Sequence, residues 1–171
     1  MTAERILLSY SKDLNNFIIR PATVCGLSDR MRLDLSVNIL TFSALKYGVI
    51  NVFGGNQLRP NIHINDMVRV YEHFLFKNIK QGIYNAGFEN EKIINIAKKI
   101  RKKLNCIINI KDSNDPRSYR LNSDKLLKTG FIPNYVIDDA IDEIINFYNQ
   151  KKLLDEKKYY NINWLKNKIV K

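Results

Sequence analysis

The sequence is poor in the residues that build disulfide frameworks, metal sites and histidine-based catalysis. It contains two cysteines, two histidines, four prolines and seven glycines among 171 residues. The low glycine and proline content excludes collagen-like and low-complexity chains. Cys25 and Cys106 are too far apart for a zinc knuckle or a Cys-x-x-Cys motif. Because both lie among apolar residues, we expect buried thiols in a reducing, cytoplasmic environment, with a disulfide as the alternative.

Long apolar runs are missing as well. No run approaches the ~20 residues that a membrane-spanning helix needs, so we expect no membrane partner. The first ten residues carry charges within their apolar pattern and lack a small-residue cleavage site, unlike a signal peptide. With 45% hydrophobic residues, the chain is instead suited to a globular domain with a sizeable core.

Positive charge exceeds negative charge by 11, and the excess is uneven. The first 90 residues have a net charge of +3 and the remainder a net charge of +8. One predicted helix carries four lysines largely outside its apolar stripe: Lys98, Lys99, Lys102 and Lys103. We interpret this as a solvated basic face, with a polyanion-binding surface as the alternative. Because no aromatic residues are interleaved with the lysines, we expect no nucleic-acid partner.

Apolar periodicity and turn residues alternate between the patterns of helices and strands. The predicted helices cover 2–11, 33–47, 65–76, 90–104, 123–129 and 138–150, followed by a helical tail. The predicted strands or extended segments cover 17–20, 49–53, 61–64, 82–85, 106–110 and 117–121. The alternation predicts an α/β or α+β fold.

Common catalytic and nucleotide-binding motifs are absent. The sequence has no GxGxxG, GxxxxGK[ST], HExxH or GxSxG pattern. His63 follows an alternating apolar pattern, which favours a structural role, and His73 lies beside Glu72 on a predicted helix surface. Neither histidine has a partner for a metal site or a nucleophile triad, so we expect no bound metal.

Three loop segments carry the remaining candidate chemistry: RPATVCG at 20–26, FGGNQLRPNIHIND at 53–66 and DPRSYR at 115–120. The first is a strand end running into a glycine turn, where backbone amides can meet a ligand. Arg59 and Arg117 lie on the other two. Arginines on separate loops suit a diphosphate, because a guanidinium binds phosphate oxygens with two parallel hydrogen bonds. For the segment around Arg59, a hairpin with a solvated arginine is the alternative.

Six segments, taken in order, resemble the C-terminal half of the extended short-chain dehydrogenase/reductases, the NAD-dependent nucleotide-sugar epimerases and dehydratases. They are AERILLSY, IIRPATVCG, RMRLDLSVNILTFSAL, INVFGGNQLRPNIHINDMVRVY, GIYNAG and DPRSYRLNSDKLLKTGFIP, and they cover roughly residues 1–148. The resemblance implies the C-terminal part of a Rossmann-type α/β fold. Residues 1–30 would be the end of the NAD-binding domain, 31–150 a smaller mixed α/β substrate-binding region, and 151–171 a basic tail.

The resemblance also implies site residues. The nicotinamide end of NAD would contact Pro21, Ala22 and Val24. Thr23 would face the sugar, and Asn38 would contact the sugar nucleotide. Asn51 and Phe53 would flank the base, and Arg59, Arg117 and Tyr119 would lie at the diphosphate. Asn61 stands where relatives often carry tyrosine, and DPRSY replaces the RPGD of many epimerases.

The family's catalytic machinery lies outside these segments. In the family, a tyrosine of a Tyr-x-x-x-Lys pair removes a proton from a sugar hydroxyl, the lysine lowers the tyrosine's pKa, and NAD exchanges a hydride. Met1 falls near the position that follows the lysine, and Tyr10 is followed four places later by Leu14. The resemblance therefore implies a chain without its Gly-rich loop and catalytic residues, from a split or frameshifted gene or a deliberate fragment.

We expect this chain to be the substrate-binding portion of an NAD-dependent nucleotide-sugar epimerase or dehydratase, inactive alone. Its partners would be a nucleotide-sugar and a separate N-terminal Rossmann half, and full-length relatives would be homodimers. The alternative is a non-catalytic module that binds nucleotide-sugars or another protein.

Overall fold

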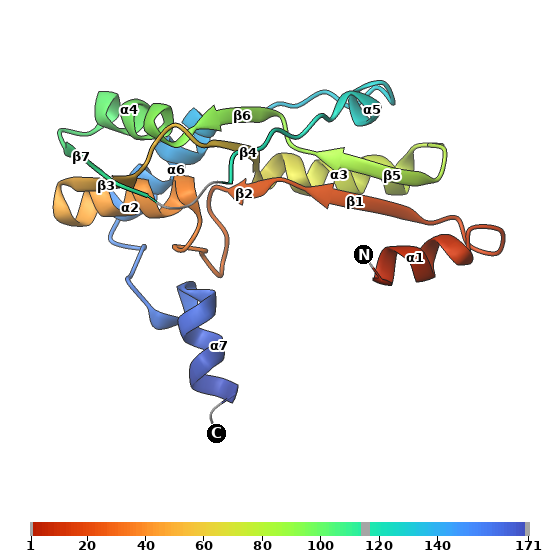
Figure 1. Cartoon of the computed structure of the whole chain (residues 1–171), viewed down its shortest axis with the longest axis horizontal. Helices are drawn as coiled ribbons and strands as arrows, with labels where there is room; N and C mark the ends of the chain where they lie inside the picture. Colours follow the sequence, from red (N-terminus) through yellow and green to blue (C-terminus); the bar gives the residue numbers. More distant parts are fainter. Residues whose placement is uncertain (1, 114–116, 170–171) are drawn as a thin grey trace.

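The chain alternates helices and short strands, as Figure 1 shows for a computed structural model that describes residues 2–113 and 117–169. The helices are α1 (Thr2–Ser9), α2 (Ser36–Tyr47), α3 (Ile64–Phe76), α4 (Ile93–Lys103), α5 (Asp124–Leu127), α6 (Ile137–Asn149), the 3-10 turn η1 (Lys157–Tyr159) and α7 (Asn161–Ile169). The strands are β1 (Phe17–Pro21), β2 (Thr23–Cys25), β3 (Val49–Phe53), β4 (Leu58–His63), β5 (Gly82–Ala86), β6 (Glu89–Lys92) and β7 (Ile107–Lys111).

The described strands form three small, mainly parallel sheets. β1 pairs with β5 and β3 pairs with β7, both in parallel. β4 lies between β2, to which it is parallel, and β6, to which it is antiparallel. In Figure 1, β3 and β7 lie with α2 and α4 at one end of the molecule, and β1 and β5 lie with α1, α3 and α5 at the other. The α/β prediction is confirmed.

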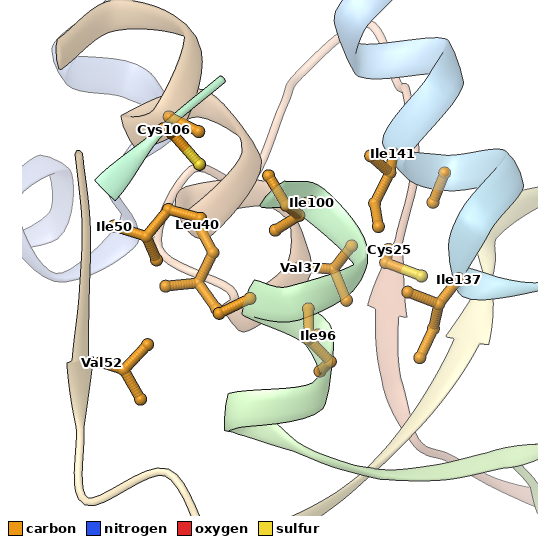
Figure 2. Packing of buried hydrophobic residues seen from close by; sticks show 13 residues of the cluster. Cys25, Val37, Leu40, Ile50, Val52, Ile96, Ile100, Cys106, Ile137 and Ile141 are labelled. Carbon is orange, nitrogen blue, oxygen red and sulfur yellow. The ribbon is translucent and has the colours of Figure 1, made fainter. Parts of the chain in front are cut away.

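The main core packs α2, α4 and α6 together with β3 (Figure 2). Residues four apart share a helix face, and this spacing places Ile96 and Ile100 of α4, and Ile137 and Ile141 of α6, in the same cluster. Ile50 and Val52 of β3 complete its wall. This cluster holds α2 rigidly beside the strands, which matters because α2 borders both hollows described below.

A second cluster packs α3 against β1 and β5, around Phe74 and Tyr84, whose ring centroids are 4.8 Å apart. A third lies beneath the C-terminal segment and contains Met31, Leu33 and Tyr159. The tail after residue 150 is therefore part of the folded structure and not an unattached appendage.

Several predicted element boundaries are wrong for identifiable reasons. The helix predicted from residue 90 begins at Ile93, because Glu89–Lys92 pairs with β4 as strand β6. The helix predicted from residue 33 begins at Ser36, because the preceding residues form a loop. The hairpin alternative for the Gly54–Gly55 turn is wrong as well: β3 and β4 flank the turn but belong to different sheets.

The ends of two helices test individual capping residues. Gly48 ends α2 with φ +67°, and its amide donates to the carbonyl of Ala44 at 2.9 Å, a left-handed glycine cap. At the start of α3, His63 is the cap, and its side chain accepts from the amide of Asn65. Asp66 is instead fully buried.

The prediction of buried thiols is confirmed. Cys25 and Cys106 are free and buried, with exposed fractions of 1% and 8%. Burial, reinforced by the nearby carboxylate of Glu89, raises the pKa of Cys25 to about 12. Within residues 2–113 and 117–169, no helix has the length and apolar character needed to cross a membrane.

Candidate functional site

A pocket of about 370 Å³ opens at the carboxyl end of β2. Ligands of parallel α/β sheets commonly bind at this edge, where loops leave the strands. Four of the five residues that the resemblance assigns to the nicotinamide and the sugar line it: Ala22, Thr23, Val24 and Asn38. The fifth, Pro21, ends β1 and does not line the pocket. We call this hollow the β2 pocket.

Asn38 holds the wall of the β2 pocket in place. Its side chain is 2% exposed, and Oδ1 accepts a hydrogen bond from the amide of Gly26 at 3.1 Å. Its Nδ2 donates to the carbonyl of Arg32 at 3.1 Å. Asn38 therefore joins both ends of the loop between β2 and α2, in addition to bordering the pocket.

The turn at Gly26 explains why His63 is buried there. Gly26 has φ +105°, and a Cβ at this position would lie 3.0 Å from Nε2 of His63. The His63 ring stacks on Tyr135 with centroids 4.8 Å apart, and its Nδ1 caps α3. Its Nε2 is 3.2 Å from Oε2 of Glu143, a close polar contact without hydrogen-bond geometry. The predicted structural role of His63 is supported.

His73 is less exposed than the prediction of a surface residue implied. Its Nε2 lies 2.8 Å from Oγ1 of Thr129, and its ring meets Phe131 edge-on at 5.5 Å. Partial burial, with a contribution from Lys77, lowers the pKa of His73. Among the described residues, no group of three or more histidine, cysteine or carboxylate side chains could hold a metal ion.

Asn51 and Phe53 line a second hollow, of about 340 Å³, on the other side of α2. They project from the same face of β3, because they are two residues apart. Phe53 is 56% exposed, and the ammonium of Lys111 lies 5.8 Å from its ring centroid. Ser36 of α2 and Ile93 of α4 supply the opposite wall.

Arg59, Arg117 and Tyr119 form a third group, which we call the arginine cluster. The amide of Tyr119 donates to the carbonyl of Leu58 at 3.4 Å, and the amide of Leu58 donates to Oγ of Ser118 at 3.1 Å. Nη1 of Arg59 donates to the carbonyls of Leu58 and Arg117. The guanidinium carbon lies 5.6 Å from the ring centroid of Tyr119. The structure therefore brings the two predicted arginine loops together.

The predicted extended segment 117–121 forms no strand: these residues have no regular secondary structure, and the amide of Tyr119 contacts the carbonyl of Leu58 without forming a ladder with β4. The side chain of Asn90 fixes its far end, because Nδ2 donates to the carbonyl of Leu121 and Oδ1 accepts from the amide of the same residue. The first two residues of the DPRSYR segment lie outside the described residues.

Some pocket residues were not found by sequence reasoning. Ser28 and Arg32, from the loop between β2 and α2, line the β2 pocket with Leu35 and Ile64. Their only sequence signal is that they follow a glycine turn before a helix. Asn61 pairs with Thr23 across β2 and β4, and its buried Oδ1 has no hydrogen-bond partner among the residues that the structure describes.

One Tyr-x-x-x-Lys spacing occurs in the chain, from Tyr148 to Lys152. The family pair needs both residues on one helix face, one turn apart. Here α6 ends at Asn149, so Lys152 lies beyond the helix, and the ring of Tyr148 packs edge-on against Phe42 at 6.1 Å. This pair does not border the β2 pocket.

Comparison with solved structures identifies proteins that share this architecture, whereas no family model matches the sequence. dTDP-glucose 4,6-dehydratase from Bacillus anthracis, solved with NAD, has a TM-score of 0.74 at 20% identity over 94% of this chain and 52% of its own. ADP-L-glycero-D-manno-heptose-6-epimerase from Helicobacter pylori has a TM-score of 0.74 at 19% identity, over 85% and 48%.

UDP-glucuronic acid 4-epimerase from Bacillus cereus, solved with UDP-glucuronic acid and NAD, has a TM-score of 0.71 at 23% identity over 86% of this chain and 50% of its own. The present chain thus spans about half the length of each solved structure. At these identities the likeness defines the fold. The chain has the fold of about half of an extended short-chain dehydrogenase/reductase of the NAD-dependent epimerase and dehydratase type.

Proposed function

We propose that this chain is the nucleotide-sugar-binding portion of an NAD-dependent epimerase or dehydratase. The observation that carries the proposal is the clustering of the residues implied by the family resemblance. Four residues implied for the nicotinamide and sugar line one pocket, and the two arginines implied for the diphosphate meet at β4. The arginines lie 58 residues apart in the sequence, so their proximity depends on the folded structure and not on a local motif.

Each group of residues has a distinct task in this proposal. Arg59 and Arg117 bind the diphosphate, because a guanidinium carries five N–H donors and can serve several acceptors at once. Tyr119 closes that side. Asn51 and Phe53 flank the base, for which the exposed ring of Phe53 is a stacking surface. Thr23 and Asn38 face the sugar.

The residues present fit one wall of an NAD site. Ala22, which lines the β2 pocket, packs closely on the far side against Gly87, where a Cβ would lie 2.5 Å from that of Ala22. NAD supplies hydride transfer when bound to such enzymes. Pro21, Ala22 and Val24 would orient its nicotinamide end, while the Gly-rich loop that holds the pyrophosphate in the family lies outside the matched segments.

The other wall would come from the rest of the fold, in the same polypeptide or in another chain. Among the described strands, β1 pairs only with β5, and parallel sheets are normally buried on both faces. Every residue of α1 is at least partly exposed, including Ile6 and Leu7. This helix is attached to β1 by a surface ion pair between Glu4 and Arg20. The open edge of β1 and the exposed apolar face of α1 are suited to packing against a further α/β unit.

Calorimetry and activity assays test the proposal together. The chain is titrated with UDP, dTDP, UDP-glucose and dTDP-glucose, alone and after assembly with an α/β unit that supplies a Gly-rich loop and a Tyr-x-x-x-Lys pair. We expect no turnover by the chain alone, and binding plus turnover with NAD by the assembly. Failure of the assembly to bind any nucleotide-sugar would refute the proposal.

Binding by the assembly without turnover would favour the alternative of a non-catalytic module. Turnover by the chain alone that is lost on mutating its own residues would show that catalytic groups reside here. Analysis of the products also decides between epimerase and dehydratase. A dehydratase removes water from the sugar, so its product has a lower mass, whereas an epimerase leaves the mass unchanged.

A further inference from the structure

The C-terminal segment after α6 folds back onto the loop between β2 and α2. Leu153 and Tyr159 are 5% and 8% exposed, and they pack in one cluster with Met31 and Leu33 of that loop, which are 1% and 0% exposed. In Figure 1 the segment leaves α6 and passes beneath α2 to reach α7. The loop therefore owes much of its apolar contact to residues more than a hundred positions later in the sequence.

Directional hydrogen bonds fix the register of this contact. The amide of Leu33 donates to the carbonyl of Tyr159 at 3.0 Å. The amide of Asn161, at the start of α7, donates to Oδ2 of Asp34 at 3.1 Å. Nη2 of Arg30 donates to Oδ1 of Asn161 at 2.7 Å. Three positions of the loop, Arg30, Leu33 and Asp34, are thus held by hydrogen bonds to the C-terminal segment. Apolar packing alone would not fix the register of the two segments.

Asp34 transmits this contact to the β2 pocket. Its carboxylate receives both Nε and Nη2 of Arg32, at 2.7 and 3.1 Å, while also accepting from Asn161. Burial raises the pKa of Asp34, but the hydrogen bonds from Arg32 and from the amide of Asn161 outweigh burial, and the net shift is downward. Arg32 lines the β2 pocket, and its carbonyl accepts from Asn38.

A second attachment ties the segment to α2, the helix that carries Asn38. The ammonium of Lys46 pairs with the carboxylate of Asp155, whose Oδ1 also accepts from the hydroxyl of Tyr160 at 2.9 Å. The segment is therefore held at both the loop and the helix that form one side of the pocket.

We propose that residues 153–161, which we term the strap, are positioning residues that fix the loop wall of the β2 pocket and thereby its affinity for the sugar end of a ligand. The identity of the ligand rests on the proposed function, whereas the effect on the loop does not. Because the strap contacts neither the arginine cluster nor the hollow at Phe53 in the contacts described above, its effect should be confined to the sugar end.

Hydrogen exchange of the full chain measures the effect on the loop directly. Tyr159→Ala removes a buried ring, and we expect the amides of residues 26–34 to exchange at least about tenfold faster while those of β3 and β7 are unchanged. Tyr159→Phe keeps the ring and should behave as the parent chain. Ile162→Ala, at a position 67% exposed on α7, is the matched control in the same segment.

Asp34→Asn provides a second variant that leaves the apolar contacts intact. It weakens the bonds to Arg32 and Asn161, so we expect faster exchange at residues 30–34 without a change in the rest of the chain. If neither variant accelerates exchange in the loop, or if the acceleration is uniform over the chain, the strap does not position the loop and the proposal is overturned.

Ligand binding separates this proposal from the proposed function. In the assembled protein, Tyr159→Ala should weaken the binding of UDP-glucose at least about fivefold more than the binding of UDP. Tyr159→Phe should bind both ligands with the affinities of the parent protein. Equal weakening of both ligands would overturn the link to the sugar end. Absence of UDP-glucose binding by the parent assembly would refute the proposed function, and the exchange result would still decide the role of the strap.

Discussion

The guanidinium of Arg59 donates a hydrogen bond to the backbone carbonyl of Arg117, which joins β4 to a loop from the second half of the chain. The contact brings the backbone of Arg117 to β4, the central strand of the β2–β4–β6 sheet, and the Arg59 guanidinium also lies 5.6 Å from the ring centroid of Tyr119. Arg59 therefore has a structural role, and the ligand-binding role proposed for it can be tested separately by substitution.

Replacing Arg59 should weaken binding of a nucleoside diphosphate to the assembled protein. A charge-assisted hydrogen bond contributes about 1.5–3 kcal/mol, so Arg59→Ala should raise the Kd for UDP by about 10- to 100-fold. Arg59→Lys keeps the charge but loses the planar fork, and it should have an intermediate effect. Calorimetry with UDP measures both. Arg101→Ala, at an exposed position on α4, is the control, and an unchanged Kd for Arg59→Ala would refute the diphosphate assignment.

Asn38 should contribute to stability through the loop that it ties together. Asn38→Ala leaves the amide of Gly26 and the carbonyl of Arg32 without their partner, so we expect a loss of about 1–3 kcal/mol in the free energy of unfolding. Asn38→Asp retains an acceptor for Gly26, but it buries a carboxylate facing the carbonyl of Arg32 and should cost at least as much at neutral pH. Urea denaturation gives the values, with Asn95→Ala as a partly buried comparison on α4. Equal stability of Asn38→Ala and the parent chain would contradict this role.

The raised pKa of Cys25 predicts that thiol reagents label this residue slowly and that the folded chain loses stability at alkaline pH. Because its folded pKa is about 12, above the ordinary value of 9.0, the thiolate forms preferentially in the unfolded chain. Its contribution to stability is therefore complete below pH 9 and is lost as the pH rises toward 12. A thiol reagent at pH 8 should modify Cys25 only after denaturant is added. Rapid modification of Cys25 in the native chain would contradict its burial. Cys25→Ala should make the free energy of unfolding less dependent on pH between about 9 and 12.

The α/β class and most helices could be predicted from local patterns, because apolar spacing and glycine stops act within a few residues. β6 could not, because Glu89–Lys92 lacks an apolar pattern and becomes a strand only by pairing with β4. The capping role of His63 was missed for a similar reason, since histidine is an uncommon N-cap and its position depends on stacking with Tyr135.

The candidate site was predicted by the family resemblance more than by spacing. Thr23 and Asn38 meet in the β2 pocket because β2 ends next to the start of α2, a neighbourhood that local sequence implies. Arg32 was missed because its place in the pocket depends on Asp34 and, through it, on Asn161 at the far end of the chain. No local pattern encodes a contact over that separation.

The basic face of α4 should bind nucleic acid only nonspecifically. Lys99 pairs with Asp138 of α6, and Lys103 lies 2.6 Å from Asp142, so two of the four lysines are neutralised by a neighbouring helix. We expect Kd values for single- and double-stranded DNA of ~10⁻⁴–10⁻⁶ M at physiological salt. The double substitution of Asp138→Asn and Asp142→Asn should tighten binding and steepen its salt dependence. A nanomolar, sequence-selective affinity of the parent chain would overturn this expectation.

The exposed apolar face of α1 should make the isolated chain associate. Ile6 of α1 and Tyr10, just beyond its end, are 55% and 52% exposed, and α1 is joined to β1 by the pair of Glu4 with Arg20. Among the described strands, β1 pairs only with β5. Exposed apolar patches and open strand edges promote association. We therefore expect the parent chain to bind a hydrophobic dye and to sediment as more than a monomer.

Substitution separates association caused by this face from general instability. Ile6→Lys combined with Tyr10→Lys should reduce dye binding and self-association without lowering the melting temperature, because both side chains are already half exposed. Ile162→Lys, at a position on α7 that is 67% exposed, should change neither property. Assembly with the complementary α/β unit should suppress dye binding by the parent chain and should be weakened by the double substitution. A monodisperse parent monomer that binds no dye would mean that α1 and β1 need no further partner, because the chain would already have closed its own core.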